Sequence, residues 1–171
     1  MKYLKTYEHL FGITFRKWLE KNPLDVNITV INLNDKKLND LDGIQEFKNL
    51  KELYCSYNKL TSLNLEGLDK LETLYCNNNH LKDLNLNGLN NLQELNCHTN
   101  KLKHLNLEGM DKLQEISCHH NNLTSLNLEG LDKLEDLYCQ NNNLPYKDLE
   151  GYWEWYQKEY PDRWEAKKFN F

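Results

Sequence analysis

The sequence lacks any long apolar run and has very little arginine. No stretch of its 171 residues approaches the roughly 18 consecutive apolar residues that span a bilayer. The N-terminus, Met1-Lys2-Tyr3-Leu4, also has no continuous apolar segment suited to export. These absences predict a cytoplasmic protein without a membrane partner.

The charge of the chain argues against a nucleic-acid partner. Arg16 and Arg163 are the only arginines, and residues 50–143 carry 13 Asp and Glu against 8 Lys. Binding to phosphates needs a basic stripe on one face, which this distribution does not supply. We therefore expect no nucleic acid among the partners.

Sequence motifs of common enzyme chemistry are missing as well. The chain contains no phosphate-binding glycine loop, no G-x-S-x-G and no C-x-x-C. The pairs Cys97-His98 and Cys118-His119 suggest a thiol beside its base, but consecutive side chains of a strand point to opposite faces. We predict a non-enzymatic protein with no catalytic residue and no cofactor.

One unit, L-x-x-L-x-C-x-x-N-x-L, recurs with a constant step of 21 residues. Its first position is occupied by Leu50, Leu71, Leu92, Leu113 and Leu134. Its sixth position is occupied by Cys55, Cys76, Cys97, Cys118 and Cys139. Its ninth position is occupied by Asn58, Asn79, Asn100, Asn121 and Asn142. A divergent first unit starts at Ile28, so six units cover residues 28–149.

This unit resembles the leucine-rich repeat, which carries Leu or sometimes Cys at position 6 and Asn or Cys at position 9. The second half of the first unit, with Leu41, Ile44, Phe47 and Leu50 in steps of three, is similar to the 22-residue repeats of bacterial internalins. The resemblance implies an α/β solenoid, a right-handed superhelix with a concave parallel β-sheet. It also implies that the protein binds another protein.

The repeated positions have structural explanations. Alternation along each short strand turns positions 4 and 6 inward, so we expect the odd number of cysteines to be buried free thiols. The position 9 amide is expected to bond the turn backbone. The glycines of the convex turn are expected to have positive φ: Gly43, Gly67, Gly88, Gly109, Gly130 and Gly151.

Both ends of the stack need a cover. Residues 1–27 are rich in aromatic and apolar side chains and predict an N-terminal cap of one or two short helices that end near Asn22-Pro23. From Asp148 to Tyr160, apolar residues at helical spacing predict a helix laid over the last coil. Residues 150–171 would form an aromatic C-terminal cap, and the whole chain would form one domain.

Positions 3, 5, 7 and 8 point out from the concave sheet, and we take them to be free of folding constraints. They form a tyrosine-rich half, an amide-lined middle and a histidine cluster beside an acidic row. Tyrosine suits protein recognition, although it also favours strands. The predicted partner-binding residues are Glu52, Tyr54, Tyr57, Thr73, Tyr75, Asn77, Asn96, His98, Glu115, Ser117, His119, His120 and Tyr138.

Two other interpretations of the surface remain open. His98 and His119 lie one repeat apart, at about 4.8 Å, a spacing that suits a zinc or copper ion, although we assign no metal. The aromatic C-terminal segment, with Trp153, Trp155 and Trp164, is an alternative surface for a partner or for homodimerisation. We expect a monomer or weak homodimer, and a role as effector or inhibitor of the partner fits the small size of the chain.

Overall fold

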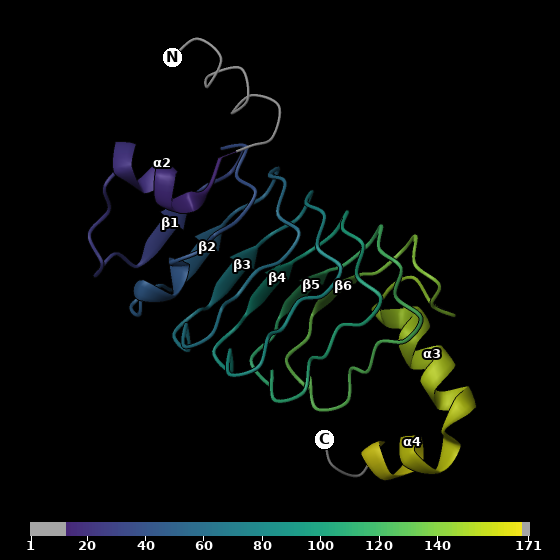
Figure 1. Ribbon diagram of the computed structural model, residues 1–171. Coiled ribbons are helices and arrows are strands. Elements are labelled where there is room, and N and C mark those ends of the chain that lie inside the picture. The colour runs from purple at the N-terminus through teal and green to yellow at the C-terminus, as the bar shows by residue number, and fades with distance from the viewer. Residues whose placement is uncertain (1–12, 169–171) are drawn as a thin grey trace.

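The computed structural model describes residues 13–168 and shows a solenoid of stacked coils (Figure 1). Six parallel strands form one sheet in chain order: β1 (Val30–Asn32), β2 (Glu52–Tyr54), β3 (Thr73–Tyr75), β4 (Glu94–Asn96), β5 (Glu115–Ser117) and β6 (Asp136–Tyr138). Each strand pairs with the next at equivalent positions, so that Leu53 lies opposite Leu74 and Leu74 opposite Leu95. The predicted solenoid is confirmed.

The core consists of columns of identical residues from successive coils. The Leu and Ile residues of position 4, the position 11 leucines other than the half-buried Leu144, and all five cysteines are buried, and the cysteine side chains are fully inaccessible. Burial raises the pKa of the Cys55 thiol to about 12 and raises the pKa of Cys76, Cys97 and Cys118 well above its usual range. The thiols are therefore neutral, small apolar groups in this core.

The position 9 asparagines form the predicted hydrogen bonds to the turn backbone. The amide of Asn79 donates to the carbonyls of Cys55 and Cys76, each at 3.0 Å, and its Oδ1 accepts from the backbone N–H of Leu60 at 3.0 Å. Asn58, Asn100 and Asn121 repeat this pattern in their own coils. The column thus ties each coil to the one before it.

The convex turns follow the prediction with one exception. Gly43, Gly67, Gly88, Gly109 and Gly130 have φ between 73° and 101°, a region in which glycine is favoured. Gly151 was expected to continue this series, but that prediction is wrong. Gly151 lies in the first turn of helix α3 (Leu149–Glu159), where its N–H donates to the capping side chain of Asp148 at 2.8 Å. A helix has replaced the turn at this step.

The N-terminal end of the stack is covered by α2 (Phe15–Lys21). The Thr14 side chain caps this helix, and Phe15 is fully buried against Phe47 of the first convex turn, which also contains the 3-10 helix η1 (Ile44–Glu46). The helix ends at Lys21, as predicted near Asn22. The remainder of the predicted cap, residues 1–12 with Leu4, Tyr7, Leu10 and Phe11, lies outside the described residues.

The C-terminal end is covered by α3, followed by α4 (Pro161–Lys168). Tyr152 and Tyr156 of α3 are buried on the last coils, which confirms the predicted helical cap. The second helix was not predicted, and it explains Trp164, whose ring lies 6.0 Å from that of Trp153. None of the helices within residues 13–168 has the length and apolarity that a transmembrane segment requires.

Candidate protein-binding surface

The concave face is made of four rows of outward side chains, one each from positions 3, 5, 7 and 8 of the coils. These four rows in the six units are called the concave face. On the strands themselves, Glu52, Tyr54, Thr73 and Tyr75 are half-buried. Asn96 and Glu115 are also half-buried, whereas Tyr138 is exposed. The parallel register places residues of equal position side by side, so each row runs across the sheet.

Tyr54 and Tyr75 form an ordered aromatic pair in the N-terminal half of this face. Their rings meet edge to face with centroids 5.2 Å apart. The Tyr54 hydroxyl donates to Glu52 at 2.8 Å, and the Tyr75 hydroxyl donates to Glu94 of the next strand at 3.0 Å. These contacts hold both rings in one orientation before any partner arrives.

The same contacts contribute to a raised pKa of both phenols. The pKa of Tyr54 is raised, chiefly by its hydrogen bond to the Glu52 carboxylate. Burial, followed by the hydrogen bond to Glu94, raises the pKa of Tyr75 to about 12. At neutral pH the pair therefore presents neutral rings beside charged carboxylates.

Two of the predicted contact residues are much less accessible than expected. Asn77 is only 5% exposed and Ser117 only 6% exposed. The Ser56 hydroxyl donates to Oδ1 of Asn77 across neighbouring coils, so these two position 7 side chains cover one another. The sequence pattern identifies the face on which a side chain lies, but its burial depends on the neighbour one coil away.

Position 8 is not free of folding constraints, contrary to the prediction. Its residues in units two to six all have left-handed backbone, with φ from 52° to 57°: Tyr57, Asn78, Thr99, His120 and Asn141. Asparagine tolerates this conformation, whereas a β-branched or aromatic residue adopts it at a cost. The asparagines at two of these five positions, Asn78 and Asn141, indicate a left-handed backbone, and the prediction did not take this signal into account. Tyr57 is nevertheless 60% exposed and projects a full aromatic ring.

The three predicted histidines do form a cluster. The rings of His98 and His119 are stacked with centroids 4.2 Å apart, and His120 meets His119 edge-on at 5.2 Å. Partial burial, followed by the neighbouring imidazoles, lowers the pKa of His98 and His119. Both rings are therefore neutral at pH 7, and Nδ1 of His119 is buried without a hydrogen-bond partner in the described part of the chain.

This geometry does not favour the metal alternative. The planes of His98 and His119 differ by only 11°, so their in-plane lone pairs run side by side instead of converging on one ion. Residues 13–168 also contain no group of three or more His, Cys, Asp or Glu side chains placed to hold a metal.

Comparison with known proteins places this geometry among solved structures. No protein-family model and no curated protein matched the sequence. The functional domain of InlJ from Listeria monocytogenes, which includes a cysteine ladder, matches 74% of this chain at 32% identity with a TM-score of 0.66. This chain is a leucine-rich-repeat protein of the internalin-like type. Its own five stacked cysteines form a similar column.

Two further structures agree. The internalin InlF from Listeria monocytogenes matches 67% of this leucine-rich-repeat protein at 25% identity with a TM-score of 0.61. A leucine-rich-repeat protein of Leptospira interrogans matches 76% at 30% identity with a TM-score of 0.57. The present chain spans only 29%, 35% and 35% of the length of InlJ, InlF and the Leptospira protein, respectively.

The charge of the concave face is one-sided. Its four rows contain no lysine and no arginine, although the whole chain has 21 of these residues. The rows do contain five carboxylates: Asp35, Glu52, Glu94, Glu115 and Asp136. The lysine that directly precedes β2, Lys51, is paired with Glu72 at 2.7 Å. The face of this leucine-rich-repeat protein is therefore acidic and aromatic.

The aromatic side chains of the C-terminal cap pack largely against one another. The ring centroid of Trp153 lies 4.9 Å from that of Tyr152 and 6.0 Å from that of Trp164. All three tryptophans of the cap are half-buried. In the described part of the cap, Tyr160 is the large hydrophobic residue that remains exposed, at 39%. Binding of a partner or of a second copy by this segment stays a prediction, and Phe169 and Phe171 lie outside the described residues.

Proposed function

We propose that this leucine-rich-repeat protein binds a basic surface of another protein on its concave face. The observation that carries the proposal is the composition of that face, which joins tyrosine rings to five carboxylates and excludes every lysine and arginine of the chain. The leucine-rich-repeat fold is a general scaffold for protein binding. A cytoplasmic location and a role as effector or inhibitor of the partner stay predictions.

The tyrosines supply the apolar part of such a contact. Tyr54, Tyr75 and Tyr57 lie in adjacent coils, and aromatic rings give a large contact area for few rotatable bonds. Because Tyr54 and Tyr75 are already held by Glu52 and Glu94, little side-chain entropy remains to be lost on binding. Tyr57, three residues after Tyr54 in the same coil, is exposed and has a left-handed backbone.

The carboxylates supply the electrostatic part. Glu94, Glu115 and Asp136 are direct neighbours in the sheet, so like charges stand about 4.8 Å apart in backbone spacing. Among the described residues, the side-chain carboxylates of Glu115 and Asp136 have no hydrogen-bonding or ion-pair partner. A lysine or arginine of the partner would relieve this repulsion, and arginine can bind a carboxylate through two parallel hydrogen bonds.

The proposal is tested by recovering the partner from an extract of the native cell and measuring its affinity for purified variants. Replacing Tyr54 and Tyr75 together by alanine is expected to weaken binding at least about 10-fold while the fold is retained. Glu115→Gln with Asp136→Asn is expected to weaken binding and to flatten its dependence on salt.

The matched control is Glu66→Gln with Glu108→Gln, which removes two charges from the convex turns, where both residues are exposed. This variant should bind like the wild type. If the partner bound the Tyr54 and Tyr75 double variant as tightly as the wild type, the concave site would be wrong. If the charge variants on both faces had equal effects, the basic character of the partner would be wrong.

A further inference from the structure

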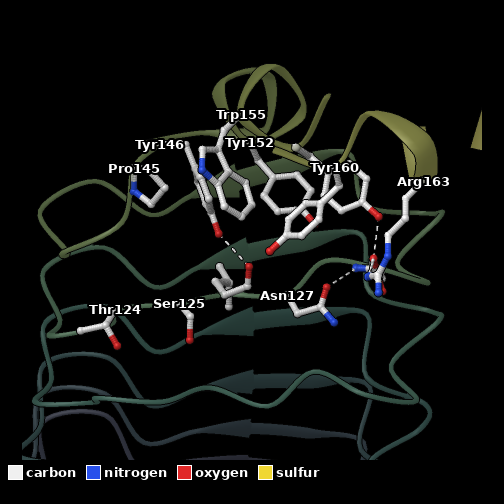
Figure 2. Close-up of a pocket in the computed structure, with 12 residues that line it drawn as sticks. Thr124, Ser125, Asn127, Pro145, Tyr146, Tyr152, Trp155, Tyr160 and Arg163 are labelled. Atoms are coloured by element: carbon white, nitrogen blue, oxygen red, sulfur yellow. Dashed lines mark hydrogen bonds and ion pairs between the residues drawn. The ribbon is translucent and has the colours of Figure 1, made fainter. Parts of the chain in front are cut away.

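A cavity of about 360 Å³ lies between the last coils and the C-terminal helices (Figure 2). None of its lining residues belongs to the concave face, so the cavity is separate from the proposed protein-binding surface. One wall is aromatic and comes from Tyr146, α3 and Tyr160, the residue that joins α3 to α4. The opposite wall is formed by residues 124–127, the segment that follows β5 and leads to the convex turn.

The aromatic wall contains more ring surface than the end of the stack requires. Tyr146, Tyr152 and Tyr156 close the cross-section of the last coil and are at most 5% exposed. The hydroxyl of Tyr146 donates to the Leu126 carbonyl at 2.7 Å, which fixes this ring. Trp155 and Tyr160 lie outside this group of buried rings and both line the cavity. Their rings meet edge to face with centroids 5.7 Å apart.

The opposite wall is polar and uncharged. Thr124 and Ser125 are exposed at the cavity, and their hydroxyls bond to no other described side chain or backbone group. Asn127 uses its Oδ1 to accept from the N–H of Glu129 at 3.0 Å, which leaves its amide NH₂ available. Figure 2 shows these three side chains on the coil next to the aromatic rings.

The two charged residues that line the cavity are paired with each other, which favours an uncharged ligand over an ionic one. Arg163 pairs with Glu129 at 3.0 Å, and the Tyr156 hydroxyl donates to the same carboxylate oxygen. An approaching cation meets the Arg163 guanidinium, and an approaching anion meets the Glu129 carboxylate. The pair is neutral as a whole, so the cavity selects an uncharged ligand.

We propose that this cavity binds a neutral saccharide, with one hexopyranose ring stacked on Trp155, its edge against Tyr160, and its hydroxyls bonded to Thr124, Ser125 and Asn127. A pyranose ring has an apolar C–H face that suits an aromatic ring, and its hydroxyls are donors and acceptors that suit the polar wall. The volume lies at the lower end of the roughly 300–1,000 Å³ of small-molecule sites, as one sugar ring requires.

The test is an NMR titration of the full chain with methyl glucoside, methyl galactoside and methyl mannoside. At least one should shift the amides of residues 124–127 and the Trp155 indole, with a Kd on the order of 1 mM. Thr124→Ala with Ser125→Ala should weaken this binding about five-fold or more, because two hydroxyl contacts are lost. Trp155→Leu should abolish it.

The chain offers a matched control. Thr61 and Ser62 form the same exposed dipeptide at the same repeat positions of the second unit, where no aromatic wall faces them. Thr61→Ala with Ser62→Ala should leave saccharide binding unchanged. Tyr160→Ala repeats the test at an exposed residue in case Trp155→Leu disturbs the cap.

Two results with the wild-type protein would overturn the proposal. One is the absence of shifts at residues 124–127 with all three glycosides up to about 50 mM, a limit well above the expected Kd. The other is saturable binding of tetramethylammonium at the same residues without binding of any glycoside, which would show a cation cage. Loss of saccharide binding in the Thr61 and Ser62 variant would likewise rule out this cavity as the site.

Discussion

The interior of the solenoid and its concave face are built from the same coils, yet they follow opposite rules. Inside, position 6 is always Cys and position 9 is always Asn in units two to six. On the concave face the residue types vary, and position 7, for example, is occupied by Ser, Asn, His and Gln in these units. An interior side chain packs against its own equivalent in the next coil, so one residue type that packs well is repeated. An outward side chain meets solvent or a partner, and stacking does not dictate its identity.

Asn100 and Asn96 show this contrast only four residues apart. Asn100 lies inside, where its amide donates to the carbonyls of Cys76 and Cys97 at 3.1 Å and its Oδ1 accepts from Leu81 at 2.9 Å. Asn96 lies on the concave face, and its buried Oδ1 has no hydrogen-bond partner in residues 13–168. The same residue type is structural in one place and dispensable to the fold in the other.

The largest expected effect comes from removing the interior amide. Asn100→Ala leaves the N–H of Leu81 buried without a partner and removes one of the two asparagine donors from each of the Cys76 and Cys97 carbonyls, so it should lower the free energy of unfolding by about 3 kcal/mol. Asn96→Ala removes an unpaired oxygen and should change the free energy of unfolding by less than about 0.5 kcal/mol. Urea denaturation of both variants measures the difference, and equal losses would refute the contrast.

The cysteine column gives the next effect. Cys97→Ser places a hydroxyl in a dry apolar column and should cost about 1–3 kcal/mol of unfolding free energy. In the native protein the five thiols should not react with a thiol reagent, because all five side chains are fully buried. Tyr138→Cys places a sixth thiol at an exposed position directly before Cys139, and this thiol alone should react at once.

The same thiols predict a loss of stability at alkaline pH. Their pKa is raised in the folded protein, to about 12 for Cys55 and Cys139, so the unfolded chain loses these protons first. Their contribution is complete below pH 9 and is lost as pH rises toward 12. Thermal melting between pH 8 and pH 11 should show a falling Tm, and a flat profile would contradict the burial of the column.

A smaller effect is expected at the histidine cluster. The pKa of His98 and His119 is lowered in the fold, so the unfolded chain takes up these protons first as pH falls. The contribution of these two histidines to the free energy of unfolding is complete above about pH 6.5 and declines below it. His119→Gln should flatten the decline measured by Tm between pH 7 and pH 5. His104→Gln, at an exposed residue outside the cluster, should not.

The smallest effect has the opposite sign. Tyr57→Asn relieves a left-handed backbone held by an aromatic residue and should raise the free energy of unfolding by about 0.5 kcal/mol. If Tyr57 contacts the partner, the same change weakens binding although the fold becomes more stable. Tyr54→Asn, in β2, has no such strain to relieve and should destabilise the protein, as differential scanning calorimetry can establish.

The amino-acid sequence alone determined the repeat, its register and the inner columns. Equal spacing brings equivalent residues together whatever the details of the coil, so the burial of Cys97 and the bonds of Asn100 followed from counting residues. The helix of the C-terminal cap was also readable, because Tyr152 and Tyr156 fall at helical spacing. The expectation for Gly151 failed because the side chain of Asp148 starts that helix at the very step where the repeat would have turned.

Only the tertiary structure decided how much of the concave face is accessible and how its side chains are held. Asn77 and Ser117 are buried, and His98 and His119 are stacked, because each side chain meets a different neighbour one coil away. The cavity beside Trp155 likewise arises from contacts between the last coils and the C-terminal helices. Periodicity fixes the side on which a residue lies, whereas its exposure and charge environment depend on packing between coils.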